Sequence, residues 1–416
     1  MPKLPTYQTD HQTITFNNSN RQIQLTIITP EIIRVSENRG DHGASYAIEG
    51  DKETTTTYTV KQQPDHYEIT TAALTIKVDA AMHIDAYDAH GNPLVTDYRG
   101  SRTPLDRGID EEHKKFVQEE GHNVPGADDQ NNPDYFQVVK DLAPDEQIYG
   151  LGDKTGYLNK RGYEYDDWNT DNPAPHLENF TRLYKSIPVM IGLKAGHPYG
   201  LFFDNPYRSH FDFGKENPNY YFYSAEAGNL NYYLIGGKTL KDIVTNYTYL
   251  TGRTPLPQKW TLGYQQSRWG YSASQKMVQD IVDSMHKYDL PFDVIHLDID
   301  YMRGYRVFTW NDEAYQGNPK KFVTDLKATG TKIVAIIDPG VKKDPGYNIY
   351  DQGIKNDYFV KDPAGNVYVN QVWPGNAVFP DFGRQAVQKW WGKNDQFLSD
   401  MGVAGIWNDM NEPASF

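Results

Sequence analysis

The 416-residue sequence contains no cysteine. This absence excludes a disulfide framework, a cysteine-ligated metal site and a thiol nucleophile. Positive charge is also scarce, because 41 Lys and Arg residues stand against 55 Asp and Glu residues and the formal net charge is −14. Such an excess of negative charge disfavours a nucleic acid or an anionic membrane as a partner.

Long apolar runs are missing as well. The N-terminal segment Met1–Gln8 lacks the apolar stretch of a signal peptide, and no run elsewhere is long enough to span a bilayer. We therefore expect a soluble cytoplasmic protein. We also expect that it needs no cofactor and no bound metal.

Aromatic side chains, in contrast, are abundant, with 31 Tyr and 8 Trp. Their faces suit stacking on sugar rings, which are apolar on one side. Tyr-rich β-sandwiches are common too, so composition alone leaves both explanations open. The length suits two to three domains of roughly 150 residues each.

Residues 1–252 have the pattern of a β-sandwich domain. Apolar and polar residues alternate in short segments such as Gln22–Ile27 and Tyr67–Val78, with turn residues between them. A glycine- and aromatic-rich stretch at about 149–175 predicts a long loop that reaches toward the active site, with Trp168 and Asp171 as its contributors. A packed surface loop is the open alternative.

Two acidic side chains of that stretch, Asp166 and Asp167, are expected to be loop or solvated carboxylates. They are therefore not assigned to the site.

Residues 253–416 change to an alternation of strands and helices. The expected strands cover 262–267, 292–300, 332–338 and 403–407, and the expected helices cover 274–288, 319–329 and 384–401. This order predicts a parallel sheet joined by right-handed crossovers. The expected fold class is thus α/β plus β: an N-terminal β-sandwich followed by the first half of a (β/α)8 barrel.

The expected strand over 292–300 has one apolar face. Its odd-numbered residues from 295 to 299 are isoleucine or leucine, whereas His296, Asp298 and Asp300 share the other face. The apolar face should pack on helices, so the carboxylates should point into the barrel. We expect His296 to be a satisfied barrel residue rather than a base.

Two later strands also end in an aspartate. Asp338 closes the strand over 332–338, and Asp409 follows the strand over 403–407. Because the carboxyl ends of parallel strands meet at one rim of a barrel, we predict that Asp298, Asp338 and Asp409 converge there.

At these residues the chain resembles a known family. The run Gly405–Pro413, GIWNDMNEP, resembles the nucleophile signature of family 31 glycoside hydrolases, the α-glucosidase family. Further segments resemble motifs of that family in the same order along the chain: Tyr149–Asp153, His296–Trp310, Ile337–Val341 and Val372–Phe382. The resemblance covers roughly residues 140–416.

The resemblance implies a retaining α-glycosidase that removes terminal α-linked glucose from oligosaccharides. Asp409 would be its catalytic nucleophile, and Asp298 and Asp338 would hydrogen-bond sugar hydroxyls. The side chains implied to line the sugar pocket are Trp373, Trp407, Met410 and Phe308, with Arg268 and Trp269 as secondary candidates. Such enzymes use two carboxylates about 5 Å apart, one as nucleophile and one as acid/base.

Two departures from the family pattern matter. Arg303 stands where many members carry Asp, so its role is open. The acid/base Asp of the family lies on a later strand, which we expect beyond Phe416. We therefore expect a fragment or one piece of a cleaved protein, which is inactive alone and completed by the remaining half of the barrel.

Other functions stay in view. Within the family these are α-xylosidase activity, α-1,3 or α-1,6 specificity, and transglycosylation. Outside it, the pair Asp298 and Asp300 has the Asp-x-Asp spacing of a metal-dependent glycosyltransferase, although so short a signal is weak. A non-catalytic sugar-binding module is the third possibility.

Overall fold

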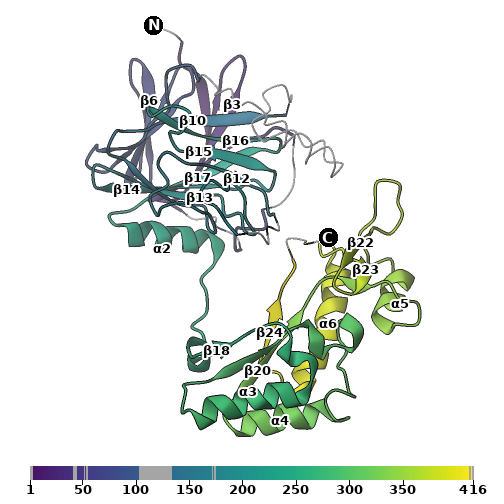
Figure 1. The fold of residues 1–416 in the computed structure, drawn as a ribbon. Helices are drawn as coiled ribbons and strands as arrows, with labels where there is room; N and C mark the ends of the chain where they lie inside the picture. Colours follow the sequence, from purple (N-terminus) through teal and green to yellow (C-terminus); the bar gives the residue numbers. More distant parts are fainter. Residues whose placement is uncertain are drawn as a thin grey trace. The chain divides into compact units, whose positions relative to one another are not determined.

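The computed structural model describes residues 3–40, 45–50, 52, 55–102, 134–170, 172, 175–411 and 414. The chain forms two compact units, Met1–Thr254 and Pro255–Phe416, drawn together in Figure 1. The division falls two residues from the expected boundary at 252/253.

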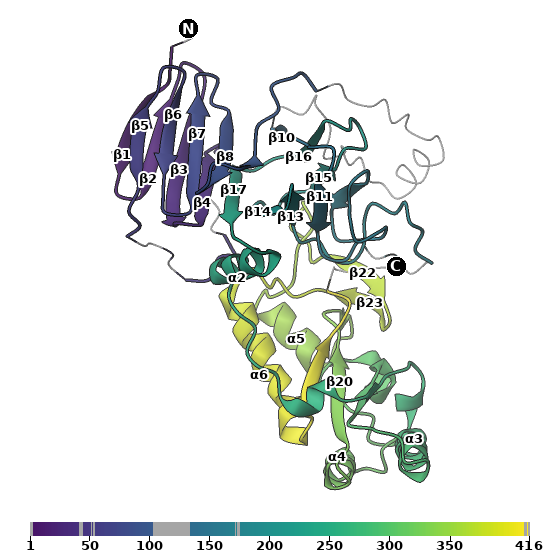
Figure 2. The same ribbon diagram turned by 90° about the vertical axis from the view of Figure 1, so that its left-hand side faces the viewer.

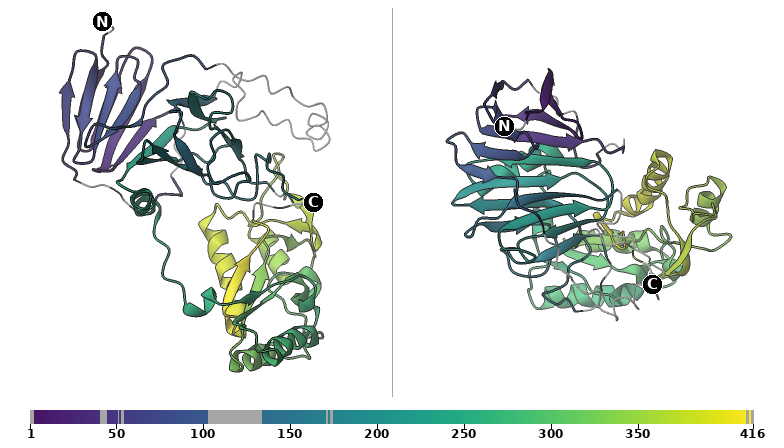
Figure 3. Two further views of the ribbon diagram at one scale, coloured as in Figure 1. Left: turned by 60° about the vertical axis from the view of Figure 1, so that its left-hand side comes forward. Right: turned by 90° about the horizontal axis from the view of Figure 1, so that it is seen from above.

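The first unit is built from antiparallel sheets. The largest has eight strands, which Figure 3 shows running side by side. In spatial order they are β1 (Thr6–Asp10), β2 (Thr13–Asn17), β3 (Gln22–Thr29), β4 (Ile32–Glu37), β17 (Leu230–Gly236), β14 (His197–Phe203), β13 (Val189–Lys194) and β11 (Gln147–Gly150). Helix α2 (Leu240–Thr251) follows β17 and is capped by the side chain of Thr239.

Two smaller sheets complete this unit. The five-stranded sheet comprises β5 (Thr59–Gln62), β6 (His66–Thr70), β7 (Leu74–Asp79), β8 (Ile84–Asp88) and β9 (Pro93–Val95). The four-stranded sheet has the order β10 (Phe136–Asp141), β16 (Tyr220–Ala225), β15 (Ser209–Asp212) and β12 (Glu164–Asp167). In Figure 2 strands β1–β4 overlap β5–β8, and apolar side chains of both sheets share one core. The predicted β-sandwich is confirmed.

The apolar and polar residues that alternate in the sequence correspond to buried and exposed side chains in the structure. In β3 the side chains of Ile23 and Leu25 are buried, while Gln22 and Gln24 are exposed. Strand β12, however, lies inside the stretch 149–175 and pairs with β15. That stretch is therefore not a loop throughout.

Many of the tyrosines fill cores. Fully buried tyrosines include Tyr165, Tyr199, Tyr220, Tyr223 and Tyr232 of the first unit and Tyr271, Tyr301 and Tyr315 of the second. The high tyrosine content thus reflects packing to a large extent. The large aromatic side chains left exposed include several tryptophans, among them Trp168, Trp269 and Trp373.

The second unit contains the predicted parallel sheet. Its order is β18 (Gln265–Gln266), β19 (Val294–Leu297), β20 (Lys332–Ile337) and β24 (Gly405–Asn408), and every pairing is parallel. The helices between the strands include α3 (Gln275–Lys287), α4 (Pro319–Ala328) and α6 (Gln385–Met401), labelled in Figures 1 and 2. This is the first part of a (β/α)8 barrel, as predicted.

The sequence marks the ends of these helices. The Ser274 hydroxyl caps α3 and the Asn318 side chain caps α4, where Pro319 occupies the first turn. Gly402 ends α6 in the left-handed conformation, with φ of 92°. These caps account for the close agreement between expected and observed helix limits.

Other elements of this unit differ from expectation. The second strand ends at Leu297, and Asp300 belongs to the 3-10 helix η3 (Ile299–Tyr301). The remaining unexpected elements are η1 (Lys259–Leu262), η2 (Tyr271–Ala273), η4 (Arg303–Tyr305), α5 (Asn348–Lys355) and a small antiparallel sheet of β21 (Val341–Lys342), β23 (Gly375–Val378) and β22 (Val369–Val372). Among the described residues, no helix combines the length and apolar character needed to cross a bilayer.

Candidate active site

The register of the parallel sheet places the three aspartates on one face. Leu297, Ala335 and Ile406 are neighbours at one level of the sheet. Asp298 lies one residue after Leu297, and Asp409 lies three residues after Ile406. Because side chains alternate along a strand, both point to the face opposite the one that Leu297 and Ile406 occupy. Asp338 lies three residues after Ala335, so its side chain points to the same face as that of Asp409. The face of the sheet thus carries His296, Asp298, Ile336, Asp338, Trp407 and Asp409.

Asp298 lies at the end of β19 and caps η3. Its Oδ1 accepts a hydrogen bond of 2.7 Å from the backbone nitrogen of Ile299. Burial raises the pKa of the Asp298 carboxyl, and the negative charges of Asp300 and Asp409 raise it further against that hydrogen bond. Asp298 and Asp409 are therefore within electrostatic range of each other.

Asp338 follows β20 and is buried, with an exposed fraction of 6%. Its charge contributes to raising the pKa of the buried Tyr301 hydroxyl, after burial itself. That hydroxyl donates a hydrogen bond of 2.9 Å to the carbonyl oxygen of Ile336. Two residues later, a Cβ at Gly340 would lie 2.6 Å from Cγ2 of Val372, so a side chain there would displace the small sheet.

Asp409 continues the ladder of β24. Its backbone nitrogen lies 3.4 Å from the carbonyl oxygen of Ile337, and its own carbonyl oxygen accepts a hydrogen bond from Asn411. The next residue, Met410, has a φ of 58°, which is unusual for a residue with a side chain. Backbone strain at this point is of the kind that clusters at functional sites.

The strained backbone at Met410 directs its side chain to the small sheet. Its Sδ accepts a hydrogen bond of 3.0 Å from Nε1 of Trp373. The side chain also packs against the buried cluster of Val372, Ala377 and Phe379. Met410 thereby links the end of β24, where Asp409 lies, to the turn between β22 and β23 that carries Trp373.

Two exposed indoles form an aromatic wall in this unit. The rings of Trp269 and Trp373 are stacked, with centroids 6.3 Å apart and an interplanar angle of 28°. Their exposed fractions are 61% and 44%, which leaves aromatic surface for a ligand. Trp269 was only a secondary candidate in the sequence analysis. No sequence pattern shows that an indole after the first strand stacks on one from the small sheet.

Phe308 behaves differently. Its ring is 8% exposed and meets Trp391 of α6 edge-on, with centroids 4.8 Å apart. Its φ of 59° turns it toward this core. In the described residues Phe308 thus belongs to the helix-facing core, in contrast to the expectation that it lines the pocket.

The remaining predicted site residues lie in the first unit. Trp168 is 45% exposed, and the guanidinium of Arg208 lies 6.0 Å from its ring centroid. Asp171 lies outside the described residues. The contribution of both to the site stays a prediction.

Arg303 is exposed at the start of η4. Its backbone nitrogen donates to Oγ1 of Thr309, and its carbonyl oxygen accepts a hydrogen bond from the side chain of Arg306. Arg306 in turn forms an ion pair of 2.6 Å with Asp344. The structure thus places Arg303 in a basic loop and leaves its guanidinium open to solvent.

A cluster of side chains in the first unit has donor atoms that could hold a metal ion. In the part of the chain that the structure describes, Glu164, His210 and Asp212 present three potential ligand atoms within 4.8 Å. Lys215 pairs with Glu164, and the Asp212 carboxylate accepts backbone hydrogen bonds from Lys215 and Glu216, so these carboxylates already have partners. Asp298 and Asp300 are not part of such a group among the described residues.

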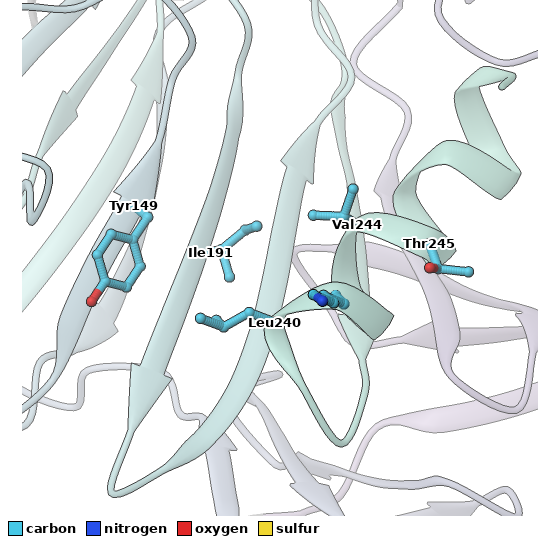
Figure 4. Close-up of a pocket in the computed structure, with 6 residues that line it drawn as sticks. Tyr149, Ile191, Leu240, Val244 and Thr245 are labelled. Carbon is cyan, nitrogen blue, oxygen red and sulfur yellow. The ribbon is translucent and has the colours of Figure 1, made fainter. Parts of the chain in front are cut away.

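A pocket of the first unit holds none of the predicted site residues. It has a volume of about 410 Å³ and lies between β11, β13 and α2. Figure 4 shows Tyr149 and Ile191 on adjacent strands opposite Leu240, Val244 and Thr245. Its lining is mainly apolar, with polar groups only on Tyr149, Lys241 and Thr245.

Family models match most of the chain. The model of the glycosyl hydrolases family 31 TIM-barrel domain matches residues 254–416, and that of the glycosyl hydrolase 31 N-terminal galactose mutarotase-like domain matches residues 22–212. The chain belongs to glycoside hydrolase family 31. The resemblance read from the sequence is confirmed.

Relatives of this family 31 chain include α-glucosidases. Alpha-glucosidase 2 of Bacillus thermoamyloliquefaciens is 43% identical over 340 residues, which are 82% of this chain and 42% of that protein. The alpha-glucosidase of Saccharolobus solfataricus is 35% identical over 67% of this chain and 40% of its own length. The chain thus spans less than half the length of these relatives.

Solved structures show the same architecture. A family 31 dextranase from Flavobacterium johnsoniae has a TM-score of 0.85 and 31% identity, and the match covers 99% of this chain and 48% of the dextranase. An α-xylosidase from a soil metagenome has a TM-score of 0.79 at 20% identity, covering 99% of this chain and 58% of the xylosidase, which supports the fold alone.

Proposed function

We propose that the whole protein is a retaining α-glycosidase that removes terminal α-linked glucose from oligosaccharides, with Asp409 as its nucleophile. The observation that carries this proposal is the placement of Asp298, Asp338 and Asp409 on one face of the sheet, with Asp409 close enough to raise the pKa of Asp298. The names of the α-glucosidase relatives support the choice of glucose.

The proposed reaction has two displacements. In the first, a carboxylate oxygen of Asp409 bonds to the anomeric carbon while the glycosidic C–O bond breaks, and a general acid gives its proton to the leaving oxygen. In the second, water attacks the anomeric carbon, the glycosyl–Asp409 bond breaks, and the water proton returns to the same acid/base group. Net retention at the anomeric carbon follows.

The other residues bind and orient the sugar. Carboxylates at Asp298 and Asp338 accept hydrogen bonds from hydroxyl groups, and a buried acceptor such as Asp338 rejects ligands that lack a hydroxyl at that point. The indoles of Trp373 and Trp407 offer apolar faces for the C–H side of the ring.

The acid/base group is proposed to lie outside residues 1–416. Glu412 lies only three residues from Asp409, too close in sequence to reach the opposite side of the bond. We therefore propose that a polypeptide limited to these residues is inactive and that the remaining half of the barrel supplies the acid. Mixing or co-expression of the two parts, assayed for activity, tests this point.

A trapping experiment tests the assignment of the nucleophile. The whole protein should hydrolyse 4-nitrophenyl α-glucoside and release α-glucose first, as seen by proton NMR. A 5-fluoro-glucosyl fluoride should add its glycosyl mass to the peptide that contains Asp409. Asp409→Asn should lower kcat at least roughly a thousandfold, whereas Asp357→Asn, an exposed carboxylate paired with Lys361, should not.

A fully active Asp409→Asn variant, or first release of β-glucose, would overturn the proposal. The linkage is a separate question. The structural neighbour from Flavobacterium johnsoniae is a dextranase solved with isomaltotriose, which makes an α-1,6 preference the second candidate. Relative kcat/KM values for maltose, nigerose, isomaltose and an aryl α-xyloside decide between these specificities.

A further inference from the structure

A row of side chains crosses the face of the parallel sheet next to Asp409. Its members are Gln265 on β18, His296 on β19 and Trp407 on β24. The atoms Nε2 of His296 and Oε1 of Gln265 are 2.9 Å apart. The rings of His296 and Trp407 meet edge to face, with centroids 5.9 Å apart and an interplanar angle of 75°. The row therefore joins the first strand of the sheet to the last.

The two rings come from strands that are not neighbours, and Gly405 makes their contact possible. His296 lies level with Val334 of β20 and with Gly405 of β24. Because Gly405 has no side chain, the imidazole and the indole can meet above β20. A Cβ at Gly405 would lie 3.3 Å from Cγ2 of Val334, tighter than an ordinary contact.

The hydrogen bonds fix which nitrogen of His296 carries the proton. The amide nitrogen of Gln265 donates to the carbonyl oxygen of Thr261 at 2.8 Å, so its Oε1 faces the imidazole as an acceptor. Nε2 of His296 must then be the donor. Burial lowers the pKa of His296, which favours the neutral ring in this orientation.

Trp407 needs such support. It lies on β24, a four-residue strand at the edge of the described sheet, and it is only partly buried. Its neighbours in sequence, Ile406 and Asn408, are exposed on the opposite face. An indole that lines a ligand site must be held to within about 0.5 Å and 10–20° by the groups behind it. Among the described residues, the ring of His296 is the aromatic group that meets it.

We infer that His296 is a positioning residue that sets the orientation of the Trp407 indole, and that Gln265 sets the orientation of His296. The inference rests on the proposed function, because it takes Trp407 as a wall of the sugar pocket two residues before the nucleophile. His296 itself touches no substrate in this account. It acts on sugar affinity through the ring contact.

The experiment measures how tightly the whole protein binds 1-deoxynojirimycin, a glucose-shaped iminosugar, by titration calorimetry, together with kcat and KM for 4-nitrophenyl α-glucoside. The variants are His296→Ala, which removes the ring, His296→Phe, which keeps a ring without the hydrogen bond, and Gln265→Ala. The matched control is His286→Ala, because His286 meets Phe292 edge-on at 6.4 Å on α3, away from the sheet face.

We expect His296→Ala to raise the inhibitor dissociation constant and KM about tenfold, the effect of losing one well-placed aromatic contact. The value of kcat should change less than threefold, because the Trp407 indole is proposed to bind the sugar equally in the ground state and the transition state. His296→Phe should restore most of the affinity, Gln265→Ala should weaken it about threefold, and His286→Ala should leave it unchanged.

A purely structural role of His296 gives a different result. It would lower the melting temperature while the folded protein kept its affinity and KM. Affinity within twofold of the parent protein in His296→Ala, or equal losses in His296→Phe and His296→Ala, would overturn the inference. If the parent protein binds the iminosugar but hydrolyses no α-glucoside, the proposed function fails while the affinities still test His296. Absence of binding by the parent protein overturns both.

Discussion

Replacing Asp166 by Asn tests how the four-stranded sheet is stabilised. Asp166 lies on β12, where its Oδ1 is 2.8 Å from Nδ1 of His210 and its Oδ2 is 3.7 Å from Nη2 of Arg208. Burial alone would raise the pKa of Asp166, but the hydrogen bond and charge of His210, with Arg208, outweigh burial and lower the pKa from 3.8 to about 2.

The lowered pKa gives the size and the sign of the effect. A pKa of about 2 in the folded state against 3.8 in the unfolded state corresponds to about 2 kcal/mol of stability. Because the folded pKa is the lower one, this stability is fully present above pH 3.8 and is lost as the pH falls through about 2. At pH 3 about 1 kcal/mol should remain.

Native-state hydrogen exchange, read on peptides from β12 and β15, measures this local stability without unfolding the second unit. Asp166→Asn should lower the opening free energy by about 2 kcal/mol at pH 7 and by about 1 kcal/mol at pH 3. Asp65→Asn is the control, because Asp65 is exposed and contacts only its neighbour His66 in the described hydrogen bonds and ion pairs. A loss below 0.5 kcal/mol at pH 7, or a larger loss at pH 3 than at pH 7, would refute the reasoning.

Three further outcomes are expected. Gly340→Ala should destabilise the second unit by about 1–3 kcal/mol in urea unfolding, because its Cβ would lie 2.6 Å from Val372; an unchanged midpoint would contradict this. Met410→Leu keeps the volume but removes the sulfur that accepts from Trp373, so KM for an aryl α-glucoside should rise about threefold while the melting temperature changes little; an unchanged KM would argue against the link. Asp409→Asn should lower the pKa of Asp298, since the charge of Asp409 helps to raise it; carboxyl NMR titration of Asp298 checks the direction, and a raised pKa would be the wrong sign.

The sequence anticipated what depends on local patterns. Alternation over 22–27 and the caps at Ser274 and Asn318 are read from adjacent residues, and the structure has the corresponding elements. The shared face of Asp298 and Asp409 also follows from counting along short strands.

Features that depend on distant partners were not anticipated. Asp166 was expected to be solvated, but its partner His210 lies 44 residues away. Asp167 is likewise buried, 2.9 Å from Lys154, and burial raises its pKa. Phe308 was expected in the pocket, yet a left-handed backbone turns its ring toward Trp391, and no pattern of residue types announces such a backbone.

The strand that leads to Asp409, the proposed nucleophile, also limits how this protein can change. Side chains alternate along a strand with a rise of about 3.3 Å per residue. Adding one residue between Gly405 and Asp409 would turn the Asp409 side chain to the helix side of the sheet. Adding two would keep its side but move it about 6.6 Å along the strand, away from Asp298. Insertions and deletions in this short stretch should therefore be lost by selection at either length.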